Sequence, residues 1–278
     1  MRPTVPISCF IIAKDEAARI GRAISSVRDW VNEVVVVVDT RSTDDTKGIA
    51  QGLGARVVEN AWAGYGPQKR FAEDLCHNPW LLNLDADEAV TPALAKEIQG
   101  LFANGQPAAD GYRIFIIELL SFQEQPNRWG HGLWQIRLYD RHKGRFSDSP
   151  VHDAVHLAAG TQTVSLKHRI EHRSNTSLSF TINKFNRYTD AQVAELRVRG
   201  RKLSRLRLLS EFPLALLKAY FVRRYFLRGL WGWTSAIDFA YFRHQRIAKA
   251  YEAGLVEKAG KIRDFRLQPS ETQSECSP

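Results

Sequence analysis

The stretch of residues 80–88, Trp-Leu-Leu-Asn-Leu-Asp-Ala-Asp-Glu, limits most strongly what this chain can fold into. It begins as an apolar run, typical of a buried strand, and ends in the carboxylates Asp85, Asp87 and Glu88. Open α/β sheets bind ligands at the carboxyl ends of their strands, and paired carboxylates suit Mg²⁺ or Mn²⁺ together with substrate phosphates. The stretch therefore predicts a metal-diphosphate site. The alternative is that these acids only begin the helix expected after Thr91.

Two earlier apolar runs also end at charged residues. Residues 7–13 stop before Lys14, and residues 34–38 are consecutive valines followed by Asp39. Helical spacing follows each run, over residues 17–30 and from Thr46. This alternation predicts an α/β fold with a mostly parallel sheet, in which the three charged strand ends line one crevice.

The pattern changes after residue 110. Aromatic and β-branched segments separated by polar turns predict an antiparallel extension of the sheet over residues 112–117, 133–139, 145–146, 151–157 and 163–166. From Ser177 the spacing is helical, and the end of the chain is rich in Ser, Glu and Pro. We therefore expect three parts: an α/β domain over 1–175, a basic helical region over 176–267 and a disordered tail over 268–278.

The charge predicts an anionic partner. The 278 residues carry a formal net charge of +9, which suits a nucleic acid, a phosphate-bearing ligand or an anionic membrane. The three cysteines lack metal-ligand spacing, which indicates a reducing compartment, and residues 1–6 do not resemble a secretory signal, so we expect a cytoplasmic location. No glycine-rich dinucleotide or P-loop motif is present in the sequence.

Basic residues accumulate between residues 196 and 228, where Glu211 is the sole acid. Large apolar residues such as Leu214, Phe221 and Trp231 are interspersed among them, without an apolar run long enough to span a bilayer. We expect the segment 196–242 to lie on the anionic inner face of a membrane. The alternative is a packed helical domain with a solvated basic face.

Several motifs together carry a family resemblance. In the first hundred residues they are Lys14-Asp15-Glu16, Val38-Asp39 with Ser42-Thr43-Asp44, Gln68-Lys69, and Leu84-Asp85-Ala86-Asp87-Glu88. Their order and spacing resemble the inverting family 2 glycosyltransferases of the GT-A fold. Later motifs resemble the bacterial lipopolysaccharide core β-glucosyltransferases that modify the inner-core heptose: Arg137-Leu138-Tyr139, Gly144-Arg145-Phe146-Ser147-Asp148, Val151-His152-Asp153, His172 and Lys184-Phe185-Asn186-Arg187-Tyr188.

The resemblance implies that 1–175 is a catalytic domain that binds a nucleotide sugar and an acceptor. It implies a UDP-glucose donor, a Mg²⁺ or Mn²⁺ ion, inversion at the anomeric carbon, and a glycolipid acceptor of the lipopolysaccharide core. The enzyme would then work as a peripheral protein on the inner face of the cytoplasmic membrane. A nucleotidyltransferase that acts on a sugar phosphate is the main alternative, and a basic nucleic-acid-binding protein is a weaker one.

The resemblance also implies roles for individual residues. Nucleotide-sugar contacts fall to Ile12, Ala13, Glu16, Asp39, Lys69 and Asp85. Among these, Asp39 would accept hydrogen bonds from the base and Lys69 would offset the diphosphate charge. Asp87 would bind the metal, with His152 or His172 as a further ligand. The alternatives are a solvated Lys69 and ordinary hydrogen-bonded histidines.

Asp153 is the candidate general base. Inversion requires a carboxylate to take the proton of the attacking acceptor hydroxyl, and Asp153 occupies the position of the family's His-Glu acid. Asp148 and Glu118 are rivals for this role. The alternative for Asp153 is a surface turn residue that pairs with an arginine.

Overall fold

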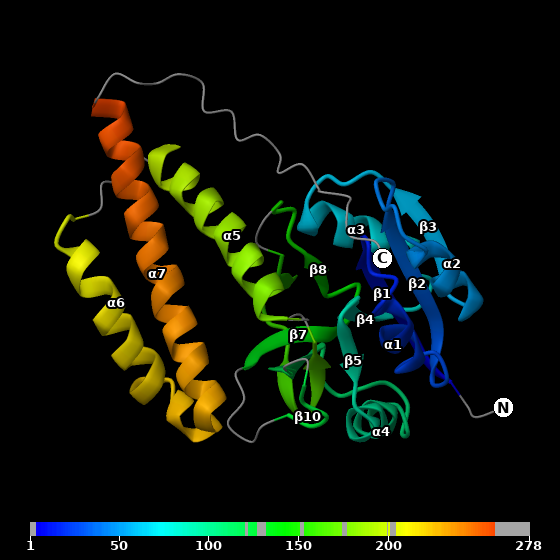
Figure 1. Cartoon of the computed structure of the whole chain (residues 1–278). Helices are drawn as coiled ribbons and strands as arrows, with labels where there is room; N and C mark the ends of the chain where they lie inside the picture. The colour runs from blue at the N-terminus through cyan, green and yellow to red at the C-terminus, as the bar shows by residue number, and fades with distance from the viewer. Residues whose placement is uncertain are drawn as a thin grey trace, which may run out of the picture. The chain divides into compact units, whose positions relative to one another are not determined.

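The computed structural model describes residues 4–119, 122–126, 132–150, 153–173, 177–198, 200 and 204–258. The chain divides into two compact units, Met1–Thr176 and Ser177–Pro278. Each unit is described by itself below, with the element labels of Figure 1.

The first unit is built on an eight-stranded sheet with the order β3-β2-β1-β4-β7-β6-β10-β5. Its strands are β1 Val5–Ala13, β2 Val31–Asp39, β3 Arg56–Asn60, β4 Trp80–Asp85, β5 Glu88–Val90, β6 Gly111–Glu118, β7 Gly132–Asp140 and β10 Thr163–His172. The first four strands are parallel to one another, whereas β7 runs antiparallel to both β4 and β6. The predicted α/β fold with a mostly parallel core and antiparallel parts is thus confirmed.

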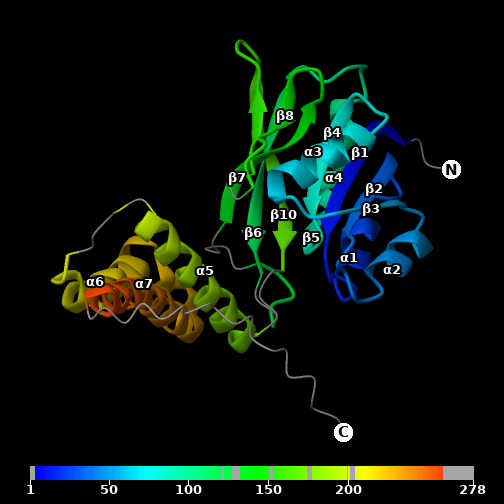
Figure 2. The ribbon, with the colours of Figure 1, turned by 90° about the horizontal axis from the view of Figure 1, so that it is seen from above.

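Helices cover both faces of the parallel part of the sheet (Figures 1 and 2). The helices α1 Ile20–Ser25, α2 Thr46–Gly52 and α4 Pro92–Leu101 contribute to one hydrophobic core, and α3 Tyr65–Leu75 contributes to the other. Alternate residues of β1 and β2 enter these two cores. This two-sided burial explains why β1 and β2 are continuous apolar runs rather than alternating ones.

Several predicted boundaries were wrong. The helix expected over 17–30 is regular only in α1, and turns occupy much of the remainder. The strand expected over 163–166 continues to His172, and β10 pairs parallel with β6 rather than antiparallel. Of the described residues 153–157, only Val155–Leu157 forms a strand, β9, which pairs with β8 Gly144–Phe146 in a separate two-stranded sheet.

The acids of the 80–88 stretch do not cap the following helix. Glu88 lies in β5, and the side chain of Thr91 caps α4 by accepting a hydrogen bond from the Leu94 N–H at 3.3 Å. Pro92 occupies the first turn of that helix, where its missing N–H costs nothing. The interpretation of Asp87 and Glu88 as a helix start is therefore wrong.

The second unit is helical. It contains α5 Leu178–Val198, α6 Arg207–Leu217, the π-helical turn η1 Lys218–Val222, the 3₁₀ turn η2 Tyr225–Arg228, and α7 Gly229–Lys258. In its interior Ala219 packs with Ala236 and Tyr225. Within the described part of the chain, no helix combines the length and the apolar character needed to cross a bilayer.

Candidate active site

The loop after β1 is tied to the loop after β2 at the carboxyl edge of the sheet. Asp15 has a φ of 52°, in the left-handed region that Asp and Asn tolerate better than most residues. Its carboxylate accepts hydrogen bonds from the Thr43 N–H at 2.7 Å and the Thr43 hydroxyl at 3.1 Å. The Glu16 N–H donates to the Thr46 hydroxyl at 2.8 Å. These bonds fix the backbone beside Ile12 and Ala13, which end β1 and are themselves buried.

A buried lysine joins two carboxylates that are far apart in the sequence. Lys69 Nζ, on α3, lies 2.9 Å from Asp85 Oδ1 and 2.5 Å from Asp153 Oδ2. Lys69 is only 2% exposed, and its ammonium also lies 5.0 Å from the centre of the Phe146 ring. Because lysine is almost never fully buried without a partner, the interpretation of Lys69 as a solvated helix residue is wrong.

Arg137 on β7 binds the two carboxylates Asp85 and Glu88 at the end of the 80–88 stretch. Its Nη2 atom lies 3.0 Å from Asp85 Oδ2 and 2.7 Å from Glu88 Oε1, and Nη1 donates to the Asn83 side chain. Glu88 in turn accepts a hydrogen bond from the Asp85 N–H at 3.0 Å. Burial opposes ionisation of Asp85, yet the charges of Lys69 and Arg137 hold its pKa well below the usual range. Asp85 is therefore an ionised carboxylate: Lys69 contacts its Oδ1 atom and Arg137 contacts its Oδ2 atom.

Asp87 meets His172 because β5 pairs antiparallel with β10. In this register Glu88 is opposite His172, and Asp87 Oδ2 lies 3.2 Å from His172 Nε2. Arg19 Nη1 approaches the same carboxylate oxygen at 3.7 Å, and Arg19 also binds Glu16 at 2.7 Å. Burial opposes ionisation of both partners, but their mutual hydrogen bond lowers the pKa of Asp87 and raises that of His172.

These residues fit a divalent cation that takes much of its coordination from a diphosphate and water. Asp87 offers a carboxylate and His172 an imidazole, and both are part-buried at the strand edge. Among the residues that the structure describes, no set of three or more His, Cys, Asp or Glu side chains is arranged to hold a metal by itself. A site with few protein ligands suits Mg²⁺ and Mn²⁺, which commonly keep waters and substrate oxygens as ligands.

Asp39 ends β2 and is 1% exposed. The Arg41 guanidinium donates two hydrogen bonds to the Asp39 carboxylate, from Nη2 to Oδ2 at 2.8 Å and from Nε to Oδ1 at 3.2 Å. This hydrogen bonding lowers the pKa of Asp39 despite its burial. A nucleoside base that used Asp39 would have to share or replace the Arg41 contact.

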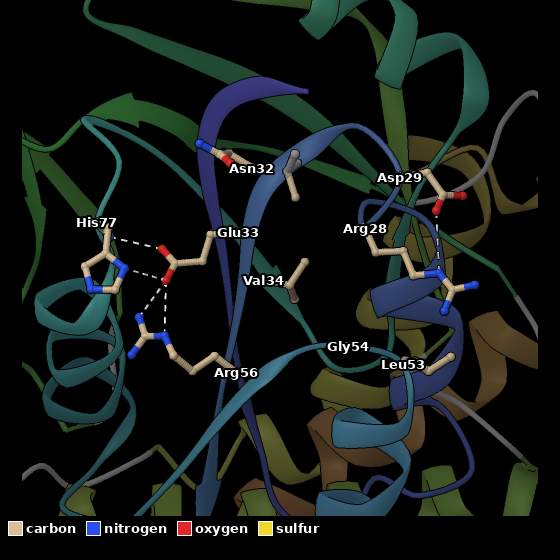
Figure 3. A pocket seen from close by; sticks show the side chains of 10 residues that line it. Arg28, Asp29, Asn32, Glu33, Val34, Leu53, Gly54, Arg56 and His77 are labelled. Carbon is tan, nitrogen blue, oxygen red and sulfur yellow. Dashed lines mark hydrogen bonds and ion pairs between the residues drawn. The ribbon is translucent and has the colours of Figure 1, made fainter. Parts of the chain in front are cut away.

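A cavity of about 500 Å³ lies at the opposite, amino-terminal edge of the same strands (Figure 3). It is lined by Arg28, Asp29, Val31, Asn32, Glu33, Val34, Leu53, Gly54, Arg56 and His77. Its central carboxylate, Glu33, is already bound by Arg56 at 2.7 Å and by the His77 N–H at 3.0 Å. Parallel sheets bind ligands at the other edge, and so we place the candidate site at the lysine-carboxylate cluster.

Comparison with known proteins identifies the family. The family model described as "Glycosyl transferase family 2" matches residues 8–169, more than half of the chain. The chain belongs to glycosyl transferase family 2. The protein is therefore a glycosyltransferase.

Curated relatives extend the similarity over nearly the whole chain. An uncharacterized glycosyltransferase of Rickettsia felis is 40% identical over 91% of this chain and 92% of its own. A lipopolysaccharide core biosynthesis glycosyltransferase, LpsC of Rhizobium meliloti, is 28% identical over 95% and 98%. A glucosyl-3-phosphoglycerate synthase structure from Mycobacterium tuberculosis aligns at 18% identity and a TM-score of 0.41 over 71% of this chain and 81% of that one, too low to support any argument.

The glycosyltransferase fold brings most of the predicted site residues to one edge of the sheet. Lys69, Asp85 and Asp153 form one cluster. Arg19 contacts both Glu16 and Asp87, and Asp87 contacts His172. His152 lies outside the described residues. Asp153 pairs with a lysine rather than with the arginine that its alternative interpretation required.

Sequence reasoning assigned no role to Arg19, Arg41 or Arg137. Each of them contacts a predicted site carboxylate. Arg137 carried a detectable signal, because it is a charged residue within the otherwise strand-like segment Gly132–Asp140. Arg19 and Arg41 lie in polar surroundings, where nothing in the sequence separates them from solvated arginines.

Proposed function

We propose that this glycosyltransferase is a metal-dependent, inverting hexosyltransferase that moves glucose from UDP-glucose onto a lipopolysaccharide inner-core or related glycolipid acceptor. The observation that carries the proposal is the cluster in which Lys69 bridges Asp85 and Asp153, next to the Asp87-His172 pair. The family assignment supports sugar transfer over nucleotidyl transfer. The relative named for lipopolysaccharide core biosynthesis supports the acceptor class.

Each residue of the cluster has a chemical task in this proposal. Lys69 and Arg19 supply positive charge toward a diphosphate, at a site where burial reduces screening by water. Asp87 and His172 would hold the Mg²⁺ or Mn²⁺ ion, with His152 as a further candidate. The ion, when bound, neutralises charge that develops on the leaving diphosphate.

Asp153 would act as the general base. The acceptor hydroxyl attacks the anomeric carbon from the face opposite the leaving diphosphate, and its proton passes to the Asp153 carboxylate as the new bond forms. The Asp153 side chain is 26% exposed, so that an acceptor can reach it. Its contact with Lys69 fixes the carboxylate in place until the substrates bind.

The proposal includes a peripheral location on the inner face of the cytoplasmic membrane, since a glycolipid acceptor resides in a bilayer.

A donor screen tests the activity itself. With Mn²⁺ present, UDP-glucose should raise the melting temperature more than other sugar nucleotides do, and without acceptor it should be slowly hydrolysed to free glucose. Hydrolysis of a nucleoside triphosphate to pyrophosphate, with no response to any sugar nucleotide, would overturn the proposal.

A further inference from the structure

Helix α6 and the turn η1 carry large apolar side chains on their outward face. The exposed residues are Leu206, Leu209, Leu214, Leu217, Phe221 and Val222, which we call the α6 apolar surface. Their exposed fractions run from 53% for Leu217 to 81% for Leu209. The spacing of Leu206, Leu209, Leu217 and Phe221 follows the helical period, so that they form one stripe rather than scattered positions.

The inward face of α6 has the opposite character. Glu211 is 7% exposed, Ala215 5% and Ala219 0%. The Glu211 carboxylate is bound by Arg207 at 2.6 Å from its own helix and by Arg243 Nε at 2.6 Å from α7. A helix exposed to water normally buries its large apolar residues and exposes its charges. Here Glu211, Ala215 and Ala219 are inside whereas Leu206, Leu209, Leu214 and Leu217 are exposed, and the stripe therefore favours a non-aqueous neighbour.

The charges around the stripe identify that neighbour. Arg205, Lys218, Arg223 and Arg224 are exposed on the same segment. Between residues 204 and 230 Glu211 is the sole acid, and it is buried and already paired. A second copy of this chain that packed through a two-fold axis would bring these basic residues against each other, whereas an anionic lipid leaflet would neutralise them.

Aromatic side chains lie beside the basic residues. Tyr220 contacts Trp233 edge-on, with ring centroids 5.2 Å apart, and Phe226 at 6.1 Å. Trp233 and Phe226 are themselves 45% and 44% exposed. Tryptophan and tyrosine prefer the boundary between lipid headgroups and acyl chains, because one end of each ring system is apolar and the other polar.

From these observations we propose that the α6 apolar surface docks on an anionic lipid bilayer, with α6 in the plane of the headgroups. The stripe from Leu206 to Phe221 covers 16 residues, or roughly 23 Å of helix. No described helix can span a bilayer. The basic residues Arg223 and Arg224, which follow the stripe, would meet lipid phosphates at the interface. This inference concerns the second unit by itself and does not depend on which sugar the enzyme transfers.

Sedimentation of the full-length protein with vesicles tests the proposal. The vesicles contain phosphatidylcholine alone or with phosphatidylglycerol, and neither donor nor acceptor is added. We expect binding to the anionic vesicles at low salt, weaker binding at higher salt, and little binding to phosphatidylcholine alone. Failure of the wild-type protein to bind anionic vesicles at low salt would overturn the proposal.

Two sets of variants separate the apolar and electrostatic contributions. The combined change Leu206→Gln, Leu209→Gln, Leu214→Gln and Leu217→Gln should lower vesicle binding by about tenfold or more and leave the circular dichroism spectrum unchanged, since these side chains are exposed. Lys218→Gln with Arg224→Asn should weaken binding and flatten its salt dependence. Asn is chosen because Arg224 has a φ of 59°.

The matched control is Leu133→Gln with Val164→Gln, which removes exposed apolar side chains from the first unit. It should bind vesicles as the wild type does. Wild-type vesicle binding by the leucine variant would overturn the proposal. Light scattering could also show that the wild type is a dimer and that the leucine variant is a monomer. That result would overturn the proposal, because the stripe would then be a contact between copies of the chain.

Discussion

Lys69 Nζ lies 2.5 Å from Asp153 Oδ2, so that the candidate base is paired with a cation that also binds Asp85. The pairing connects α3, the end of β4 and the segment before β9. A donor diphosphate competes for the same ammonium, and its arrival would loosen the hold on Asp153 at the moment when a base is needed. Under the proposed function, one lysine would therefore couple donor binding to base activation.

We expect Asp153→Asn to leave donor binding intact and to lower kcat by about two orders of magnitude or more, because the amide cannot accept the acceptor proton. Calorimetry with UDP-glucose and steady-state kinetics measure the two effects separately. The matched control is Asp148→Asn, on an exposed side chain. If Asp148→Asn lost turnover and Asp153→Asn kept it, the base would be Asp148.

We expect Asp87→Ala to abolish Mn²⁺-stimulated turnover, whereas Asp85→Asn should retain part of it, because Asp85 is held by Lys69 and Arg137 rather than by His172. Electron paramagnetic resonance of Mn²⁺ in the presence of UDP reports metal binding independently of activity. Asp29→Ala, at an exposed carboxylate away from the strand-end cluster, is the control. Undiminished Mn²⁺ binding by Asp87→Ala would locate the metal elsewhere.

We expect Arg137→Met to lower the free energy of unfolding by about 3–5 kcal/mol, because it leaves Glu88 and Asp85 without their shared cation. Urea denaturation followed by circular dichroism measures the loss. Arg137→Lys should cost less, since it keeps the charge and loses the fork. Adding Glu88→Gln to Arg137→Met should recover part of the stability; an additive loss would show that the two side chains do not interact.

We expect the stability contributed by Glu33 to depend on pH. Burial opposes its ionisation, but hydrogen bonds from Ser8, the His77 N–H and Arg56 hold the pKa of Glu33 below its usual range. A lowered pKa means that the folded state favours the carboxylate. The contribution is therefore complete above the unfolded pKa of about 4.3 and disappears as the pH falls through the folded pKa.

Glu33→Gln tests this expectation. At pH 7 the variant should unfold with a free energy lower by on the order of 1–3 kcal/mol. The difference from the wild type should stay constant down to about pH 5 and shrink below that. Glu59→Gln, at a half-exposed carboxylate on the neighbouring strand β3, is the control. A difference that grew on acidification would contradict the assignment.

The sequence alone determined the parallel core and the residues at its carboxyl edge. Five consecutive valines in β2 and the apolar run of β4 can be buried only in a sheet covered on both faces. Because such strands run in the same direction, Asp39 and Asp85 must then end at one edge. Lys69, Asp85, Asp87 and Asp153 were singled out because their motifs resemble those of the family in order and spacing.

Only the tertiary structure decided which of these groups are partners. Lys69 meets Asp153 because α3 packs beside the segment before β9, and His172 meets Asp87 because β10 extends further than its local pattern indicates and pairs with β5. Arg137 reaches Asp85 and Glu88 across the antiparallel β4-β7 pair. These contacts join residues 49 to 85 positions apart, and no local propensity encodes such distances. Ion pairs form wherever folding brings opposite charges together out of water, and that is a property of the packed chain.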